Sequence, residues 1–192
     1  MSRKLPVILM SLLGVAVLAM VGVGFWLSRP EPRETKVLTL DPAISLDDLI
    51  EVPADGADGC PGYSFASPAS SGTEMISGAD GSRSEATITI AAEEAFALSV
   101  CLGPVSELGT PDEAIEAALS EGDREQVGPL VDVSSAYGDA TALTTRVGRM
   151  LLTDFYVEQD GWLHAVGYLR PEEVGDTYLP TVEAVLASWA WD

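Results

Sequence analysis

Residues 150–171 read MLLTDFYVEQDGWLHAVGYLRP, and this stretch decides the fold of the chain. Apolar side chains recur with period two on both sides of Asp160-Gly161, a dipeptide typical of a two-residue hairpin turn. Two strands joined so tightly must be antiparallel neighbours. The register then predicts these cross-strand pairs: Val157 with His164, Phe155 with Val166, and Thr153 with Tyr168.

Both faces of this hairpin are largely apolar, so we expect both to be covered at least in part. One face collects Phe155, Val157, Trp162, His164, Val166 and Tyr168. The other face carries Leu152, Tyr156, Leu163, Ala165 and Leu169.

Two more strands are expected directly before the hairpin, which makes a four-strand meander. The pattern predicts strands at Leu130–Tyr137, Ala140–Val147, Met150–Val157 and Trp162–Leu169. Gly138-Asp139 is interpreted as the turn between the first two, and Gly148 as the turn between the second and third.

Earlier in the chain, residues 86–90 and 96–102 alternate with period two and predict a hairpin. Thr110-Pro111-Asp112-Glu113 is a capping box that predicts the start of a helix, which Gly122 ends. After the meander, residues 177–189 carry an apolar stripe at helical spacing, with Asp176 as the expected N-cap. The final helix should lie across one face of the sheet.

The predicted fold class is therefore α+β, an antiparallel sheet behind an N-terminal transmembrane helix, with its core at residues 85–192. Residues 37–84 are expected to be loop-rich because Gly, Ser, Asp, Ala and Pro dominate most of them. Within that segment, residues 37–40 are a candidate strand and residues 45–50 a candidate helical turn.

Residues 5–27 form an uncharged run of 23 residues, long enough for a helix that crosses a membrane. A cleavable signal peptide is the alternative, but its apolar region is usually shorter. Residues 1–4 would be a cytoplasmic tail and residues 28–36, with two prolines and alternating charges, a linker. We expect a single-pass protein of the cell membrane with its body outside the cytoplasm.

Charge excludes one class of partner. From Val37 onward the chain has 28 acidic and five basic residues, a net charge near −23. Such a body repels phosphate backbones and has no basic stripe for counterion release. Nucleic-acid binding is therefore excluded.

Cys60 and Cys101 are the only cysteines. Outside the cytoplasm, two cysteines without CxxC spacing are expected to form one disulfide. Two buried free thiols are the alternative.

Two segments carry a resemblance to a known family: FYVEQDGWLHAVGYLRP (155–171) and YLPTVEAVLASWAW (178–191). Over about residues 88–191 the order of elements resembles the Mog1/PsbP-like fold, and within it the LpqN-type branch of cell-envelope proteins. The resemblance implies an accessory or binding role. It supplies no catalytic residue.

His164 is the only histidine, so catalysis by a Ser-His-Asp arrangement would have to use it. No motif for a catalytic residue, a metal or a cofactor is present, and none of the three is predicted. We expect a non-catalytic binding or accessory protein whose partner is a protein or a small apolar ligand. The candidate binding residues are Phe155, Trp162, His164 and Tyr168, although aromatic stripes in strands more often belong to the core. The alternatives are an envelope hydrolase that uses His164 with nearby carboxylates, and a structural subunit of a membrane complex.

Overall fold

The computed structural model describes residues 33–54, 59–68, 72–77, 84–90, 95–120 and 122–192. The predicted cytoplasmic tail and transmembrane helix, and most of the predicted linker, lie outside these residues. No helix within the described ranges has the length and apolar character needed to cross a membrane.

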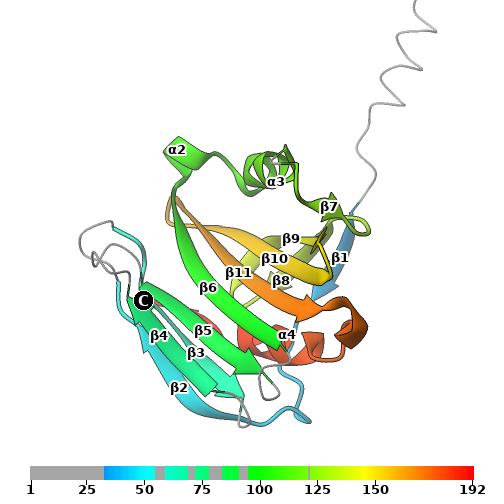
Figure 1. Cartoon of the computed structure of the whole chain (residues 1–192). Helices are drawn as coiled ribbons and strands as arrows, with labels where there is room; N and C mark the ends of the chain where they lie inside the picture. The colour runs from blue at the N-terminus through cyan, green and yellow to red at the C-terminus, as the bar shows by residue number, and fades with distance from the viewer. Residues whose placement is uncertain (1–32, 55–58, 69–71, 78–83, 91–94, 121) are drawn as a thin grey trace, which may run out of the picture. The chain divides into compact units, whose positions relative to one another are not determined.

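A large sheet occupies the centre of the unit formed by residues 33–192 (Figure 1). Within the described ranges, eight strands follow the order β1-β8-β9-β10-β11-β6-β5-β4, and a ninth, β7, pairs with β9. The strands are β1 (Glu34–Val37), β4 (Gly72–Ser77), β5 (Ser84–Ile90), β6 (Ala95–Pro104), β7 (Glu125–Gln126), β8 (Val131–Ser135), β9 (Gly138–Val147), β10 (Met150–Gln159) and β11 (Trp162–Pro171). All pairs are antiparallel except β1 with β8, which is parallel.

The meander and its register are confirmed. β10 and β11 pair Val157 with His164, Phe155 with Val166 and Thr153 with Tyr168. Asp160-Gly161 is the turn, and both residues have a positive φ, as this type of turn requires. The hairpin predicted over residues 86–102 is also present as β5 and β6, and β6 joins the meander beside β11.

One predicted turn is wrong by two residues. Ser135 pairs with Gly138, so the turn between β8 and β9 is Ala136-Tyr137 and not Gly138-Asp139. Tyr137 is fully buried, its N–H donates to Ser135 Oγ at 3.1 Å and to the Leu186 carbonyl at 3.1 Å, and its ring packs against Trp189. The free energy gained by burying the Tyr137 ring outweighs the preference of Gly138-Asp139 for a turn.

The start of the body contains more regular structure than its composition predicts. β1 occupies the end of the segment interpreted as a linker, and the candidate strand at residues 37–40 shares only Val37 with it, because residues 38–40 are not in a strand. The candidate helical turn at residues 45–50 is wrong, because residues 46–50 belong to strand β2 (Leu46–Val52). β2 and β3 (Tyr63–Pro68) pair with each other, and β12 (Ala190–Trp191) completes a second sheet of three strands in the order β12-β3-β2.

The helices are close to their predicted positions. α3 (Pro111–Ser120) begins with the predicted capping box, in which the Thr110 N–H donates to Glu113 Oε2 at 2.7 Å and the Glu113 N–H to Thr110 Oγ1 at 3.4 Å. A short helix, α2 (Val105–Leu108), precedes it. α4 (Leu179–Ala187) follows a 3₁₀ turn, η1 (Glu172–Val174). α4 is shorter than predicted at both ends, and Asp176 is not its N-cap.

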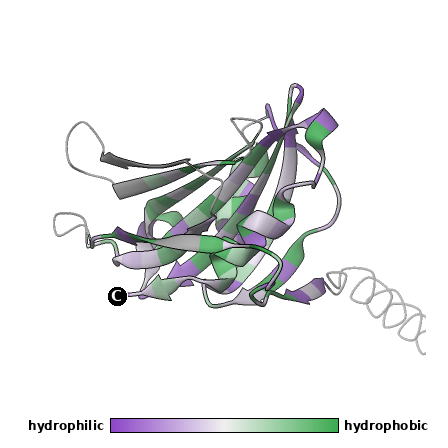
Figure 2. Ribbon diagram, turned by 90° about the horizontal axis from the view of Figure 1, so that it is seen from below, coloured by the Kyte–Doolittle hydropathy of each residue, from purple (hydrophilic) through white to green (hydrophobic). Residues whose placement is uncertain are grey.

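Both faces of the large sheet are covered, although unequally. The main core lies between one sheet face, α4 and the second sheet, and it contains Phe155, Val157, Val166, Tyr168 and Trp189. A smaller cluster under α3 on the opposite face contains Ile115, Leu143, Tyr156 and Ala165. Seen from below, hydrophobic and hydrophilic residues alternate along many of the strands (Figure 2). The sheet is thus one layer with two cores, as the two apolar faces predict.

β6 turns its small residues to the main core. Ala95, Ala97, Ser99 and Cys101 are buried, whereas Leu98 on the other face is 38% exposed. The small side chains leave room for the second sheet to pack closely. The predicted disulfide is present between Cys60 and Cys101, with a Cα–Cα distance of 6.4 Å, and it ties the segment before β3 to β6.

Candidate functional site

The four aromatic residues proposed from the sequence do not form one open patch. Phe155, His164 and Tyr168 are buried, with 3%, 0% and 0% of their surface exposed. Trp162 is half-buried at the beginning of β11, where it lines a shallow hollow together with Gly59, Cys60 and Asp160. Among the residues that the structure describes, no open groove joins Trp162 to Tyr168, and the core interpretation fits Phe155, His164 and Tyr168.

Aromatic rings from the second sheet and from the chain after α4 cover this face. The Tyr63 ring packs edge-on against His164 at a centroid distance of 5.0 Å, and Trp191 does the same at 5.1 Å. Trp189 stacks on Tyr63 at 4.5 Å and on Phe65 at 5.2 Å. The sequence gives no indication that Tyr63 and Phe65 reach this face, because they lie in the segment expected to be loop-rich.

His164 makes hydrogen bonds to hydroxyl groups inside this cluster. Its Nδ1 lies 3.0 Å from Tyr137 Oη, and its Nε2 lies 3.5 Å from Ser99 Oγ, which in turn donates to Tyr63 Oη at 2.7 Å. Burial lowers the pKa of His164 to about 3, so the ring is neutral at physiological pH. The single Tyr137 hydroxyl proton has two acceptors within reach, His164 Nδ1 and the Phe155 carbonyl at 3.3 Å. A neutral ring with its proton on Nε2 accepts from Tyr137 at Nδ1, whereas a ring with its proton on Nδ1 donates to Tyr137, which then donates to the Phe155 carbonyl.

This arrangement does not match the hydrolase alternative. A catalytic histidine needs an accessible nucleophile and a carboxylate that orients the ring. Ser99 is only 4% exposed, and the described partners of the His164 ring nitrogens are hydroxyl groups. Among the described residues, no group of three or more His, Cys, Asp or Glu side chains is placed to hold a metal ion.

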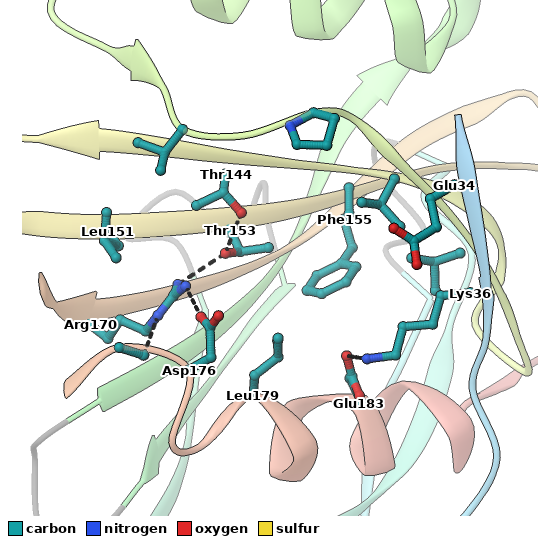
Figure 3. Close-up of a pocket in the computed structure, with 16 residues that line it drawn as sticks. Glu34, Lys36, Thr144, Leu151, Thr153, Phe155, Arg170, Asp176, Leu179 and Glu183 are labelled. Atoms are coloured by element: carbon teal, nitrogen blue, oxygen red, sulfur yellow. Dashed lines mark hydrogen bonds and ion pairs between the residues drawn. The ribbon is translucent and has the colours of Figure 1, made fainter. Parts of the chain in front are cut away.

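A cavity of about 380 Å³ lies between the large sheet and α4, on the face of the sheet that carries Phe155. It is lined by residues of β1, β8, β9, β10 and β11 and of the chain from Gly175 into α4 (Figure 3). Its volume falls within the range of small-molecule sites. The apolar part of its wall consists of Val127, Pro129, Val131, Val133, Ala142, Leu151, Phe155 and Leu179. Phe155 is thus the one candidate binding residue that reaches this cavity.

Arg170 forms the polar end of the cavity, and only 2% of its surface is exposed. Its Nε donates to the Gly175 carbonyl at 2.6 Å, its Nη1 donates to Thr153 Oγ1 at 2.9 Å, and its Nη2 forms an ion pair with Asp176. Nη1 also donates to the Tyr168 carbonyl at 3.4 Å, so four partners hold the Arg170 charge at one end of the cavity (Figure 3).

A second ion pair lies at the opposite end of the cavity. Lys36 of β1 pairs with Glu183 of α4, and Glu34 lies two residues before Lys36 on the same strand (Figure 3). Since β1 and α4 are far apart in the sequence, only the folded sheet brings these charges together. The polar groups of the lining thus lie at its two ends, and Phe155 and Leu179 lie between them.

Arg170, Thr144 and Thr153 were missed by the sequence analysis. Arg170 follows Tyr168 by two positions, so period two puts it on the same face as the buried Val166 and Tyr168. A charged residue on an apolar strand face was a usable signal, because buried charges need partners.

A second buried charge lies on the opposite face of the sheet. Asp154 is 8% exposed and pairs with Arg124 at 3.3 Å, and Tyr156 Oη donates to it at 3.5 Å. Burial raises the pKa of Asp154 to about 6, although Arg124 and the hydrogen bond from Tyr156 act in the lowering direction. As predicted, period two separates Asp154 from His164.

Comparisons with known proteins give little to identify this chain. No family model matches it, and no curated protein matches it. One similar solved structure is the solution structure of cyanobacterial PsbP (CyanoP) from Synechocystis sp. PCC 6803, with 17% identity and a TM-score of 0.48. The match covers 79% of this chain and 97% of that chain. Nothing about the function of this chain follows from a similarity of this size.

Proposed function

We propose that this chain is a non-catalytic binding protein of the cell envelope, anchored in the membrane through residues 5–27, and that it holds a small apolar ligand beneath α4. The observation that carries the proposal is the cavity of about 380 Å³ with apolar walls and charged groups at its two ends. Sites for small organic molecules commonly combine a mostly apolar wall with a few polar groups.

The buried position of His164 supports the non-catalytic part of the proposal. The only histidine of the chain is surrounded by the rings of Tyr63, Tyr137, Trp189 and Trp191, and it does not line the cavity. Arg170 and Lys36, the basic residues of the lining, are both held in ion pairs. The lining is thus suited to binding a ligand, and nothing in it resembles an activated nucleophile.

The disulfide supports the location outside the cytoplasm, because such bonds persist in oxidising compartments. The resemblance to LpqN-type cell-envelope proteins implies the same location. Protease added to intact protoplasts should therefore digest the body of the protein. Complete protection of the body would contradict the proposed orientation.

Ligand binding can be tested on the full chain in lipid nanodiscs. Fluorobenzene is a small, neutral, apolar probe, and its ¹⁹F NMR signal should broaden and shift with the protein beyond its response to empty nanodiscs. Leu151→Trp puts a large ring into the cavity and should abolish the specific signal. Leu152→Trp is the matched control, because Leu152 lies on the opposite face of β10. Equal responses from both variants, or no response at all, would contradict the proposed site.

A further inference from the structure

The polar end of the cavity contains a chain of three hydrogen-bonding groups. Arg170 Nη1 donates to Thr153 Oγ1 at 2.9 Å, and Thr153 Oγ1 lies 3.0 Å from Thr144 Oγ1 (Figure 3). A guanidinium can only donate, so Thr153 Oγ1 accepts the first bond. The next bond joins two hydroxyl groups, and either oxygen can be its donor.

Counting protons shows that one hydroxyl donor remains. The two threonines together carry two hydroxyl protons, and the bond between them uses one. Within the described part of the chain, neither hydroxyl has an acceptor for the second proton. Both threonines line the cavity, with Thr153 buried and Thr144 half-buried. The remaining proton can therefore be donated to a ligand in the cavity, and the charge of Arg170 polarises the chain in that direction.

The charged residues that line the cavity determine whether the hydrogen-bond acceptor of the ligand is anionic, neutral or cationic. Its lining contains the cations Arg170 and Lys36 and the carboxylates Glu34, Asp176 and Glu183. Both cations are already paired, the first with Asp176 and the second with Glu183. An anionic ligand would find no unpaired cation there and would enter a body with a large negative net charge. The third carboxylate, Glu34, is exposed and lies at the end of the cavity opposite Arg170 (Figure 3). A cationic head group has no lone pair to accept the hydroxyl proton at the Arg170 end.

We infer that the ligand has an apolar body and one neutral hydrogen-bond acceptor, a ketone, ester or ether oxygen, that accepts from the Thr144–Thr153 hydroxyl pair. This inference rests on the proposed function of the cavity and specifies its ligand class. The apolar body lies against Phe155, Val133 and Leu179, and the acceptor lies at the Arg170 end. The two threonines are thus the residues that determine polar specificity.

Three matched probes test this class on the full chain in nanodiscs. 4-Fluoroacetophenone, 4-fluorobenzoate and 4-fluorobenzylammonium share a ring and differ in the charge of one substituent. Dissociation constants from ¹⁹F NMR titrations should show the ketone at least tenfold tighter than either ion. A preference for either ion would overturn the inference.

Threonine variants distinguish hydrogen bonding by the Thr144–Thr153 hydroxyl pair from general packing against the ligand. The double variant Thr144→Val/Thr153→Val keeps the shape and removes both hydroxyl protons, so ketone affinity should fall about five- to tenfold, the loss of one polarised hydrogen bond. Thr144→Ser/Thr153→Ser restores both hydroxyls and should restore binding. Thr145→Val is the matched control, because Thr145 lies on the opposite face of β9 and does not line the cavity. An unchanged ketone affinity in Thr144→Val/Thr153→Val would overturn the inference.

Failure of the inference differs from failure of the proposed function. If all three probes bind equally and Leu151→Trp blocks them all, the cavity binds ligands and only the acceptor specificity is wrong. If none of the probes binds, and fluorobenzene also fails to bind, the proposed function is itself wrong.

Discussion

The Arg170 guanidinium lies over the Tyr168 ring, with its central carbon 4.5 Å from the ring centroid. These two residues lie on the same face of β11, two positions apart, and both are almost completely buried. The contact joins the end of the cavity to the aromatic core, because Tyr168 packs in the core and Arg170 lines the cavity.

Replacing Arg170 by methionine should destabilise the protein by about 2–3 kcal/mol. The variant keeps much of the side-chain volume but leaves the Gly175 carbonyl and Thr153 without their donors. Asp176 is 67% exposed and can return to water, which limits the loss. Urea denaturation measures the change in unfolding free energy. Arg149→Met, at an exposed turn position, is the control and should change it little.

Asp154 should make the protein more stable as pH falls from about 6 towards 4. The folded state raises the pKa of Asp154 from near 3.8 to about 6, so the folded chain takes up this proton before the unfolded chain does. The stabilisation is present at low pH and is lost as pH rises through about 6. The difference corresponds to roughly 3 kcal/mol as an upper limit. The unfolding free energy of Asp154→Asn, measured against pH, should lack this component. An identical pH profile in the variant would contradict the assignment.

His164 should not titrate between pH 5 and 8. It is the only histidine of the chain, so its imidazole signals in NMR are unambiguous. Burial lowers its pKa to about 3 in the folded state, whereas an unfolded histidine has a value near 6.5. The unfolded chain therefore binds the proton first, and this group reduces stability as pH falls below about 6.5, opposite in sign to Asp154. A chemical-shift midpoint near 6.5 in the folded protein would show that the ring is accessible to water.

Removing the disulfide should cost about 4 kcal/mol of stability according to the loop-entropy model for 41 residues of separation. The double variant Cys60→Ala/Cys101→Ala should show this loss in urea denaturation without reductant. Dithiothreitol should destabilise the natural chain by a similar amount and leave the double variant unchanged. A natural chain that is insensitive to the reductant after complete reduction would contradict the prediction.

Much of the large sheet could be predicted because the turns and alternating patterns that determine it lie within short segments of the sequence. The register of β10 with β11 depends on one two-residue turn and an alternating pattern, and both lie within residues 150–171. The turn at Ala136-Tyr137 could not be predicted in this way. Its position depends on burying Tyr137 against Trp189, more than 50 residues later in the chain.

The candidate site was less predictable than the fold. Its cavity needs the parallel pairing of β1 with β8, and no turn or short loop in the sequence indicates such a pairing. The second sheet was missed for a similar reason, because β3 pairs with β12 near the opposite end of the described chain. Trp162 lines a separate hollow, whereas Phe155, His164 and Tyr168 are buried on one face. The sequence could not show that Tyr63 and Phe65 would cover them.

The pairing of Ala190 with Ser64 has a consequence for the order in which this protein acquires its structure. β12 cannot add to β3 before residues 190–191 have been synthesised, more than 120 residues after β3, and contacts between such distant segments form slowly. Until then, Trp189 and Trp191 cannot close over His164 and Tyr63. The aromatic core around His164 therefore closes only after β12 is available, which makes its closure a late step of folding.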